Sequence, residues 1–240
     1  MGLGSVYVGN RADSKVCAID SASLAKGPCL KLDSMPDGLA YVAATKEVWV
    51  TTPRDNSLTI LDASAALTAK ATITLDGQPE GFAVDEARGI FYTNLEDKDR
   101  TLSIDIRSHA VTKTWMPGCG EEGPRGLALD QQHDFLLVAC PSRVIVLDAG
   151  HDGKLLSSVD TGEGVDNIDF VASRHELYAA AAGAAKLTVA RLDAQGKLTA
   201  VATVATAPGA RNAVATDEGT AYVTDSREGK VLVAKLAAAK

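Results

Sequence analysis

One unit of strands and turns returns about every 41 to 45 residues along the chain. Each unit contains a short apolar run, a polar loop and a second short apolar run, which an acidic residue usually closes. The runs are short and rich in β-branched residues, so they favour strands over helices. A repeat of this length is typical of propeller blades or solenoid repeats. The repeat therefore predicts an all-β chain.

Six copies align on the second strand of the unit, but two strand types are present only five times. The second strands are expected at residues 6–10, 48–52, 91–94, 136–140, 177–180 and 221–225, and the third at 16–20, 58–62, 102–105, 144–148, 187–191 and 231–234. The fourth strands are expected at 29–32, 71–75, 111–115, 155–159 and 198–202, and first strands follow the turns at 35–38, 78–81, 123–126, 164–167 and 209–212. The first unit thus lacks an inner strand and the last unit lacks an outer one.

This inventory predicts a β-propeller with six recognisable blade repeats and incomplete end blades. We expect one domain over residues 1–240, with repeats at about 1–33, 34–76, 77–119, 120–161, 162–206 and 207–240. Propellers protect their strand edges by closing the ring. The incomplete ends therefore indicate either a seven-bladed propeller shortened at its N-terminus or a six-bladed ring with thin end blades. Fraying of loose ends is the plainer alternative.

Charge and hydropathy exclude several partners. The net charge of −7 argues against a general nucleic-acid binder, which needs clustered Lys and Arg. No apolar run reaches the roughly 18 residues that a membrane span needs, and the sequence shows no signal peptide.

The four cysteines fall into two pairs. Cys17 and Cys29 lie on the third and fourth strands of one unit, while Cys119 and Cys140 lie in loops at the same end of another. Neither spacing is a zinc signature. Two disulfides would indicate an oxidising compartment, and so a periplasmic or secreted protein whose export signal is absent from this chain. Buried free thiols are the alternative.

Polar residues gather where the fourth strand leads into the next first strand, which in a propeller is the channel face. We expect a mixed-charge ring there that could bind a small polar or zwitterionic ligand, because Arg takes carboxylates bidentately. Mutual pairing of these acids and arginines is the structural alternative. The candidate ligand-binding residues are Asp37, Glu80, Glu121, Glu122, Arg125, Asp166, Asn167, Arg211 and Asn212.

No catalytic residue is predicted. The four histidines fall in turns at the opposite end of the blades and are interpreted as solvated turn residues, so no Ser-His-Asp or Cys-His system is expected at the ring. The aromatic residues at one repeat position, Tyr7, Trp49, Tyr92, Tyr178 and Tyr222, are interpreted as core residues.

The segments Tyr7-Val8-Gly9-Asn10, Tyr92-Thr93-Asn94 and Tyr222-Val223-Thr224-Asp225, with Ile-Asp or Leu-Asp strand ends, resemble the YVTN-type (YncE-like) β-propeller repeat family. The resemblance covers nearly the whole chain. It implies an exported binding or scaffold protein, often with seven blades, and says little about activity.

A second resemblance supplies the alternative function. Met35–Ala40 and Gln78–Gly81 are similar to segments of the gluconolactonase propellers, whose metal is held by Glu, Asn and Asp. That resemblance implies that Glu80, Asp166 and Asn167 bind a divalent cation. The chain would then be a metal-dependent lactonase-like hydrolase. The main expectation is a non-catalytic exported propeller without a cofactor, which binds a small polar ligand or a protein partner on its channel face.

Overall fold

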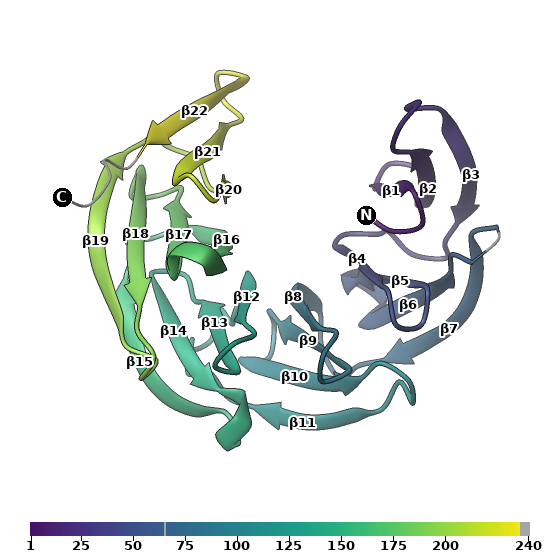
Figure 1. The fold of residues 1–240 in the computed structure, drawn as a ribbon, viewed down its shortest axis with the longest axis horizontal. Coiled ribbons are helices and arrows are strands. Elements are labelled where there is room, and N and C mark those ends of the chain that lie inside the picture. Colours follow the sequence, from purple (N-terminus) through teal and green to yellow (C-terminus); the bar gives the residue numbers. More distant parts are fainter. Residues whose placement is uncertain (65, 236–240) are drawn as a thin grey trace. The chain divides into compact units, whose positions relative to one another are not determined.

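The computed structural model describes residues 1–64 and 66–235, which form two compact units, Met1–Thr114 and Trp115–Lys240. Each unit is built from antiparallel sheets of three or four strands, and Figure 1 shows each sheet as neighbouring arrows of one colour range. The expectation that residues 1–240 form one domain stays a prediction.

The described residues of unit 1 form three sheets. The first is β1 (Ser5–Asn10), β2 (Lys15–Asp20) and β3 (Lys26–Lys31). The second is β4 (Leu39–Val42), β5 (Glu47–Thr52), β6 (Ser57–Asp62) and β7 (Thr68–Thr74), with a short 3-10 helix η1 (Pro53–Asp55) between β5 and β6. The third is β8 (Pro79–Asp85), β9 (Ile90–Leu95), β10 (Arg100–Asp105) and β11 (Val111–Trp115), whose last residue opens unit 2.

The described residues of unit 2 also form three sheets. They are formed by β12 (Leu127–Asp130), β13 (Phe135–Ala139), β14 (Arg143–Asp148) and β15 (Lys154–Asp160); by β16 (Val165–Val171), β17 (Glu176–Ala181), β18 (Lys186–Leu192) and β19 (Leu198–Ala205); and by β20 (Ala213–Ala215), β21 (Thr220–Asp225) and β22 (Lys230–Lys235). The 3-10 helices η2 (Ala149–His151) and η3 (Ala172–Arg174) follow β14 and β16.

The predicted all-β fold is confirmed, including the uneven strand inventory. Among the described residues the first and last sheets have three strands each and the other four sheets have four. The first sheet begins at the second-strand position of the repeat, and the last sheet ends at the third-strand position, as the alignment of the repeats predicts.

Within each unit the core lies between neighbouring sheets, because facing sheets pack against one another. In unit 1, Trp49 and Ile60 pack against Phe91 of the following sheet. In unit 2, Tyr178 and Val189 pack against the sheet of β20 to β22. The interpretation of the repeated aromatic residues as core is therefore right for these two positions, since Trp49 and Tyr178 are both fully buried.

At Tyr222 that interpretation is wrong. Its side chain is 44% exposed, although it occupies the repeat position of Tyr178. The reason is that Tyr222 lies on the face of the last sheet against which no other sheet of unit 2 packs in the described residues.

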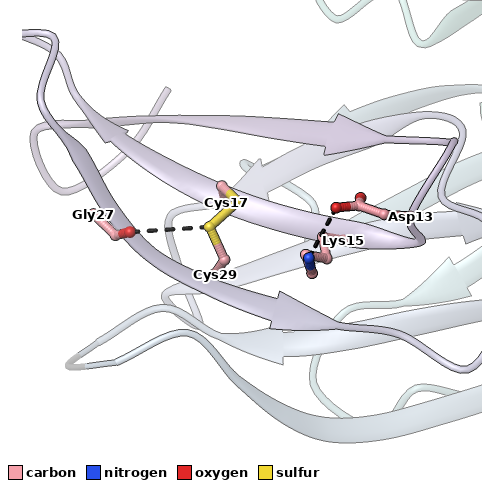
Figure 2. Close-up of a disulfide and its surroundings, with 5 residues drawn as sticks. All are labelled: Asp13, Lys15, Cys17, Gly27 and Cys29. Atoms are coloured by element: carbon pink, nitrogen blue, oxygen red, sulfur yellow. Dashed lines mark hydrogen bonds and ion pairs between the residues drawn. A yellow bond between two sulfur atoms is a disulfide. The ribbon is translucent and has the colours of Figure 1, made fainter.

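Both predicted disulfides are present. Cys17 and Cys29 are directly opposite each other on β2 and β3, and Figure 2 shows their bond joining the two strands near the Asp13–Lys15 ion pair. Cys119 bonds to Cys140 in unit 2. None of the described helices is long and apolar enough to cross a membrane.

The interpretation of all four histidines as solvated turn residues is also wrong in part. The His109 imidazole lies edge-on against the Trp49 indole, with ring centroids 5.3 Å apart. His133 stacks on Phe135 and its Nδ1 lies 2.7 Å from an Asp130 carboxylate oxygen. His151, in contrast, is exposed as expected. Turns between strands hold these rings against the sheet because the rings also offer apolar surface.

Candidate functional site

A polar pocket of about 290 Å³ lies in unit 2, at the end of the blades where the sequence predicts the ligand site. It is surrounded by two connecting loops and one tight turn. The lining residues are Cys119, Glu121, Glu122, Cys140, Pro141, Ser142, Arg143 and Glu163. Two predicted site residues, Glu121 and Glu122, are therefore among them.

The first wall is the loop between β11 and β12, which carries Glu121 and Glu122. The Cys119–Cys140 disulfide ties this loop to the end of β13. A hydrogen bond is the second tie: Nη2 of Arg143, at the start of β14, donates to the Gly118 carbonyl oxygen. Both ties attach just before Glu121 in the sequence, at Gly118 and Cys119, and they restrict the loop's conformational freedom before any ligand binds.

The floor is the tight turn from β13 to β14, where the Cys140 amide donates to the Arg143 carbonyl oxygen at 2.8 Å. The second wall is the loop between β15 and β16. Its Thr161 and Gly164 amides donate to the carbonyl oxygens of Ser142 and Pro141, at 2.9 and 2.8 Å. Backbone hydrogen bonds therefore join floor and wall.

Glu163 stands on this second wall with its backbone fixed and its side chain exposed. Its carbonyl oxygen accepts from the Gly183 and Ala184 amides at 3.0 and 3.1 Å. The neighbouring Gly164 has φ +89°, and a Cβ there would lie 2.6 Å from the Gly183 nitrogen. Only glycine fits this position, so the close approach of the two loops depends on it.

The charges around the pocket are three carboxylates, from Glu121, Glu122 and Glu163, and one guanidinium, from Arg143. A guanidinium carries five N–H donors in a planar fork, which suits a carboxylate. Carboxylates accept hydrogen bonds from ammonium or hydroxyl groups. The arrangement can therefore bind both ends of a small zwitterion.

Inner-strand residues from the predicted ring also meet in unit 2. Asp166 on β16 forms an ion pair with Arg211, which precedes β20. The distance between Arg211 Nε and Asp166 Oδ2 is 3.2 Å. The amide of Gly126, the residue before β12, donates to the Asp166 carbonyl oxygen at 2.7 Å. The structural alternative of mutual pairing thus holds for Asp166 and Arg211.

Three further predicted residues lie on the same inner strands or beside them. Arg125 donates through its backbone amide to Ala139 at 2.7 Å. Asn167 is exposed on β16. The side-chain oxygen of Asn212 is buried and has no hydrogen-bond partner in the described part of the chain. A buried acceptor of this kind usually indicates a water or a ligand donor.

The remaining two predicted residues, Asp37 and Glu80, belong to unit 1. The Asp37 carboxylate accepts from Arg11 Nη1 at 2.8 Å, and Glu80 lies near the start of β8. A ring that includes residues of both units stays a prediction.

The alternative metal set also spans both units, so the set of Glu80, Asp166 and Asn167 stays a prediction. Within unit 2, the Arg211 guanidinium beside Asp166 opposes a second cation at the same carboxylate. Across the described residues, no group of three or more His, Cys, Asp or Glu side chains is placed to hold a metal ion.

Two buried glutamates at the opposite end of the blades have a structural role. Glu47 accepts hydrogen bonds from Trp49 at 2.9 Å and Thr45 at 2.8 Å. It also forms an ion pair with Lys70, at 2.7 Å. Burial alone would raise the pKa of Glu47, but these partners outweigh burial and hold it below its usual value.

Glu176 occupies the same repeat position and is held in the same manner. It accepts from Arg174 at 2.7 Å, Tyr178 at 2.9 Å and Arg191 at 3.0 Å. Burial would raise the pKa of Glu176, and the three donors lower it overall. Burial and the adjacent carboxylate raise the pKa of Tyr178.

Sequence reasoning missed Arg143, Ser142 and Glu163 in the pocket. Arg143 and Ser142 follow Cys140 within the β13–β14 turn, and Glu163 lies between Gly162 and Gly164. Two sequence features could have indicated these residues. Glu163 is flanked by two glycines, and Arg143 lies three residues after the disulfide-bonded Cys140.

Comparisons with known proteins identify the fold. No family model matches the sequence. No curated protein matches it either. A chain of the mitotic checkpoint complex superposes with a TM-score of 0.83 at 12% identity, covering 97% of this chain and 71% of that chain.

Bacterial structures are also similar. A protein of unknown function from Desulfotomaculum acetoxidans has a TM-score of 0.75 at 15% identity. The match covers 97% of this chain and 79% of the Desulfotomaculum chain. A candidate 6-phosphogluconolactonase from Bacteroides fragilis has a TM-score of 0.79 at 19% identity, covering 96% and 76%. At these identities the similarity shows the β-propeller fold alone.

Proposed function

We propose that the chain is a non-catalytic, exported binding protein that takes a small zwitterion, of the size of an amino acid or dipeptide, in the pocket of unit 2. The observation that carries this proposal is the pocket's charge layout, with Arg143 and three glutamates around about 290 Å³. That volume is at the lower end of small-molecule sites. The ligand carboxylate would bind Arg143, and its ammonium group would bind Glu163 or the paired glutamates.

Export is proposed from the two disulfides, since such bonds persist in oxidising compartments. The Cys119–Cys140 bond also supports the binding function directly. It holds one pocket wall in place in the free protein, and a pre-formed site loses less conformational entropy on binding.

Isothermal titration calorimetry with a panel of free amino acids and dipeptides tests the proposal. We expect at least one of these probes to bind, and Glu163→Gln to weaken that binding about tenfold, because it removes a charged hydrogen-bond acceptor. The matched control is Glu218→Gln, which removes the same charge in the β20–β21 turn at the opposite end of the blades. The pocket assignment would be overturned if Glu163→Gln, Glu121→Gln and Glu122→Gln all bound the probe as tightly as Glu218→Gln does.

A metal-dependent lactonase-like hydrolase is the alternative, and its use of Asp166 gives it a separate test. Hydrolysis of 6-phosphogluconolactone would be followed with and without added Mg²⁺, Ca²⁺ or Zn²⁺. Cation-dependent turnover that Asp166→Asn abolishes, in a variant that keeps its circular dichroism spectrum, would replace the binding function by the hydrolytic one.

A further inference from the structure

The last sheet of unit 2 carries an exposed apolar face. Val214, Tyr222 and Val233 lie directly opposite one another on β20, β21 and β22. Val231 precedes Val233 by two residues on β22, so its side chain lies on the same side of the sheet. Their side chains are 64%, 44%, 57% and 57% exposed. We call these four residues the last-sheet face. Contiguous exposed apolar surface of this kind commonly marks an interaction site.

The repeat shows what covers an equivalent face. In the preceding sheet, Tyr178 and Val189 occupy the positions of Tyr222 and Val233, and both are fully buried. The residues that bury them include Ala221 and Val223, which are the second and fourth residues of strand β21. An aliphatic pair at alternate positions of a second strand thus covers the aromatic row.

Unit 1 repeats the same contact twice. Val48 and Val50, the second and fourth residues of β5, are fully buried against Tyr7 and Val16 of the first sheet. One sheet further on, Phe91 of β9 stacks on the Trp49 ring, with centroids 4.7 Å apart. The blade-to-blade contact is therefore directional, with an aromatic row on one side and the second-strand pair on the other.

The first sheet presents the covering half of this contact. Val6 and Val8 are the second and fourth residues of β1, on the side of the sheet away from Tyr7. Ile19 and Cys17 lie opposite them on β2. We call Val6, Val8 and Ile19 the first-sheet face. Val8 is 46% exposed.

We propose that the last-sheet face of one chain binds the first-sheet face of a second copy of this chain. The contact would repeat the directional packing that already joins neighbouring sheets inside each unit. The partner is a second copy because the chain itself carries the matching half. Such a contact is heterologous, so each bound copy still offers one free face for another copy.

Sedimentation velocity across a concentration series tests the proposal. The wild-type chain should reach at least twice its monomer mass of 24.9 kDa as concentration rises. Val233→Lys and Val8→Lys should each abolish the association, because a lysine charge would be buried in an apolar contact. Val201→Lys is the control, since Val201 is a similarly exposed valine on the outer strand β19.

Mixing the variants makes the test specific for a heterologous contact. The Val8→Lys chain keeps an intact last-sheet face, and the Val233→Lys chain keeps an intact first-sheet face. Their equimolar mixture should form dimers and no larger species. Val231→Lys replaces Val233→Lys if the latter fails to fold, as judged by circular dichroism.

Three outcomes would overturn the proposal. A wild-type chain that stays monomeric throughout would mean that the last-sheet face is covered within one chain or by another protein. Association that Val233→Lys abolishes and Val8→Lys leaves intact would indicate a symmetric contact between two last-sheet faces. Association that neither substitution alters would place the interface elsewhere.

Discussion

Replacing Glu176 by Gln removes the charge from a buried carboxylate that three donors hold. The Glu176 side chain is only 2% exposed, and its partners Arg174 and Tyr178 lie at 2.7 and 2.9 Å. A hydrogen bond to a charged group contributes about 1.5 to 3 kcal/mol. Arg191 is half exposed, so solvent screens its share. We expect Glu176→Gln to lower the free energy of unfolding by about 2 to 4 kcal/mol at neutral pH.

The pH dependence identifies the origin of this loss. The folded pKa of Glu176 lies below its unfolded value, so its contribution is present above the unfolded pKa of about 4.3 and is lost as the pH falls through the folded pKa. The stability difference between wild type and Glu176→Gln should therefore shrink in acid.

Urea denaturation at several pH values between about 7 and 3 measures this difference. Tyr178→Phe serves as the matched variant, because it removes one donor to Glu176 and keeps the buried ring. It should lower the free energy of unfolding by about 1 to 2 kcal/mol. A Glu176→Gln loss of stability that stays constant from neutral pH to pH 3 would contradict this prediction, since the ionised carboxylate would then contribute nothing.

Three further predictions concern the scaffold around the candidate site. Removing the Cys17–Cys29 disulfide by the double substitution Cys17→Ser and Cys29→Ser should lower the free energy of unfolding in urea by about 2 to 3 kcal/mol, because the unfolded chain gains conformational entropy. An unchanged midpoint of urea denaturation would contradict this. Gly126→Ala should lower the melting temperature by about 4 °C or more, because its Cβ would lie 2.7 Å from the Asp166 carbonyl oxygen; a melting temperature within 1 °C of wild type would show that the loop shifts freely. Arg211→Gln should change stability by less than about 1 kcal/mol, because the Arg211 side chain is 58% exposed and solvent screens its ion pair with Asp166; a larger loss in the same urea assay would contradict this.

Most of the fold is predictable from the sequence because each blade repeats the same local chemistry. Apolar β-branched runs separated by turn residues fix the strands, and the repeat fixes which strand each run becomes. The strands β11 and β1 show how close this comes, since β11 has the predicted bounds and β1 begins one residue early. Even the three-stranded first and last sheets of the described residues follow from alignment of the repeats.

The candidate site is less predictable because it depends on which loops meet. Glu121 and Glu122 are found by their place in the repeat, while Arg143 and Glu163 join them only through the Cys119–Cys140 bond and the close packing of two loops. Periodicity carries no information about such contacts.

The buried glutamates were recognisable in principle. A Glu two residues before a core aromatic lies on the same face of a strand, and a buried Trp N–H or Tyr O–H needs an acceptor. Glu47 with Trp49 and Glu176 with Tyr178 satisfy this rule. Arg174 lies two residues before Glu176, but Lys70 and Arg191 come from other strands, β7 and β18, which the spacing alone does not show.

A crystal structure of the chain grown with its tightest-binding amino acid or dipeptide would show whether the unit 2 pocket is the ligand site. We predict ligand density in the pocket of unit 2, with the ligand carboxylate at Arg143 and its ammonium group at Glu163 or the Glu121–Glu122 pair. Density at another place on the chain, or an empty pocket at a ligand concentration that saturates binding in solution, would contradict it.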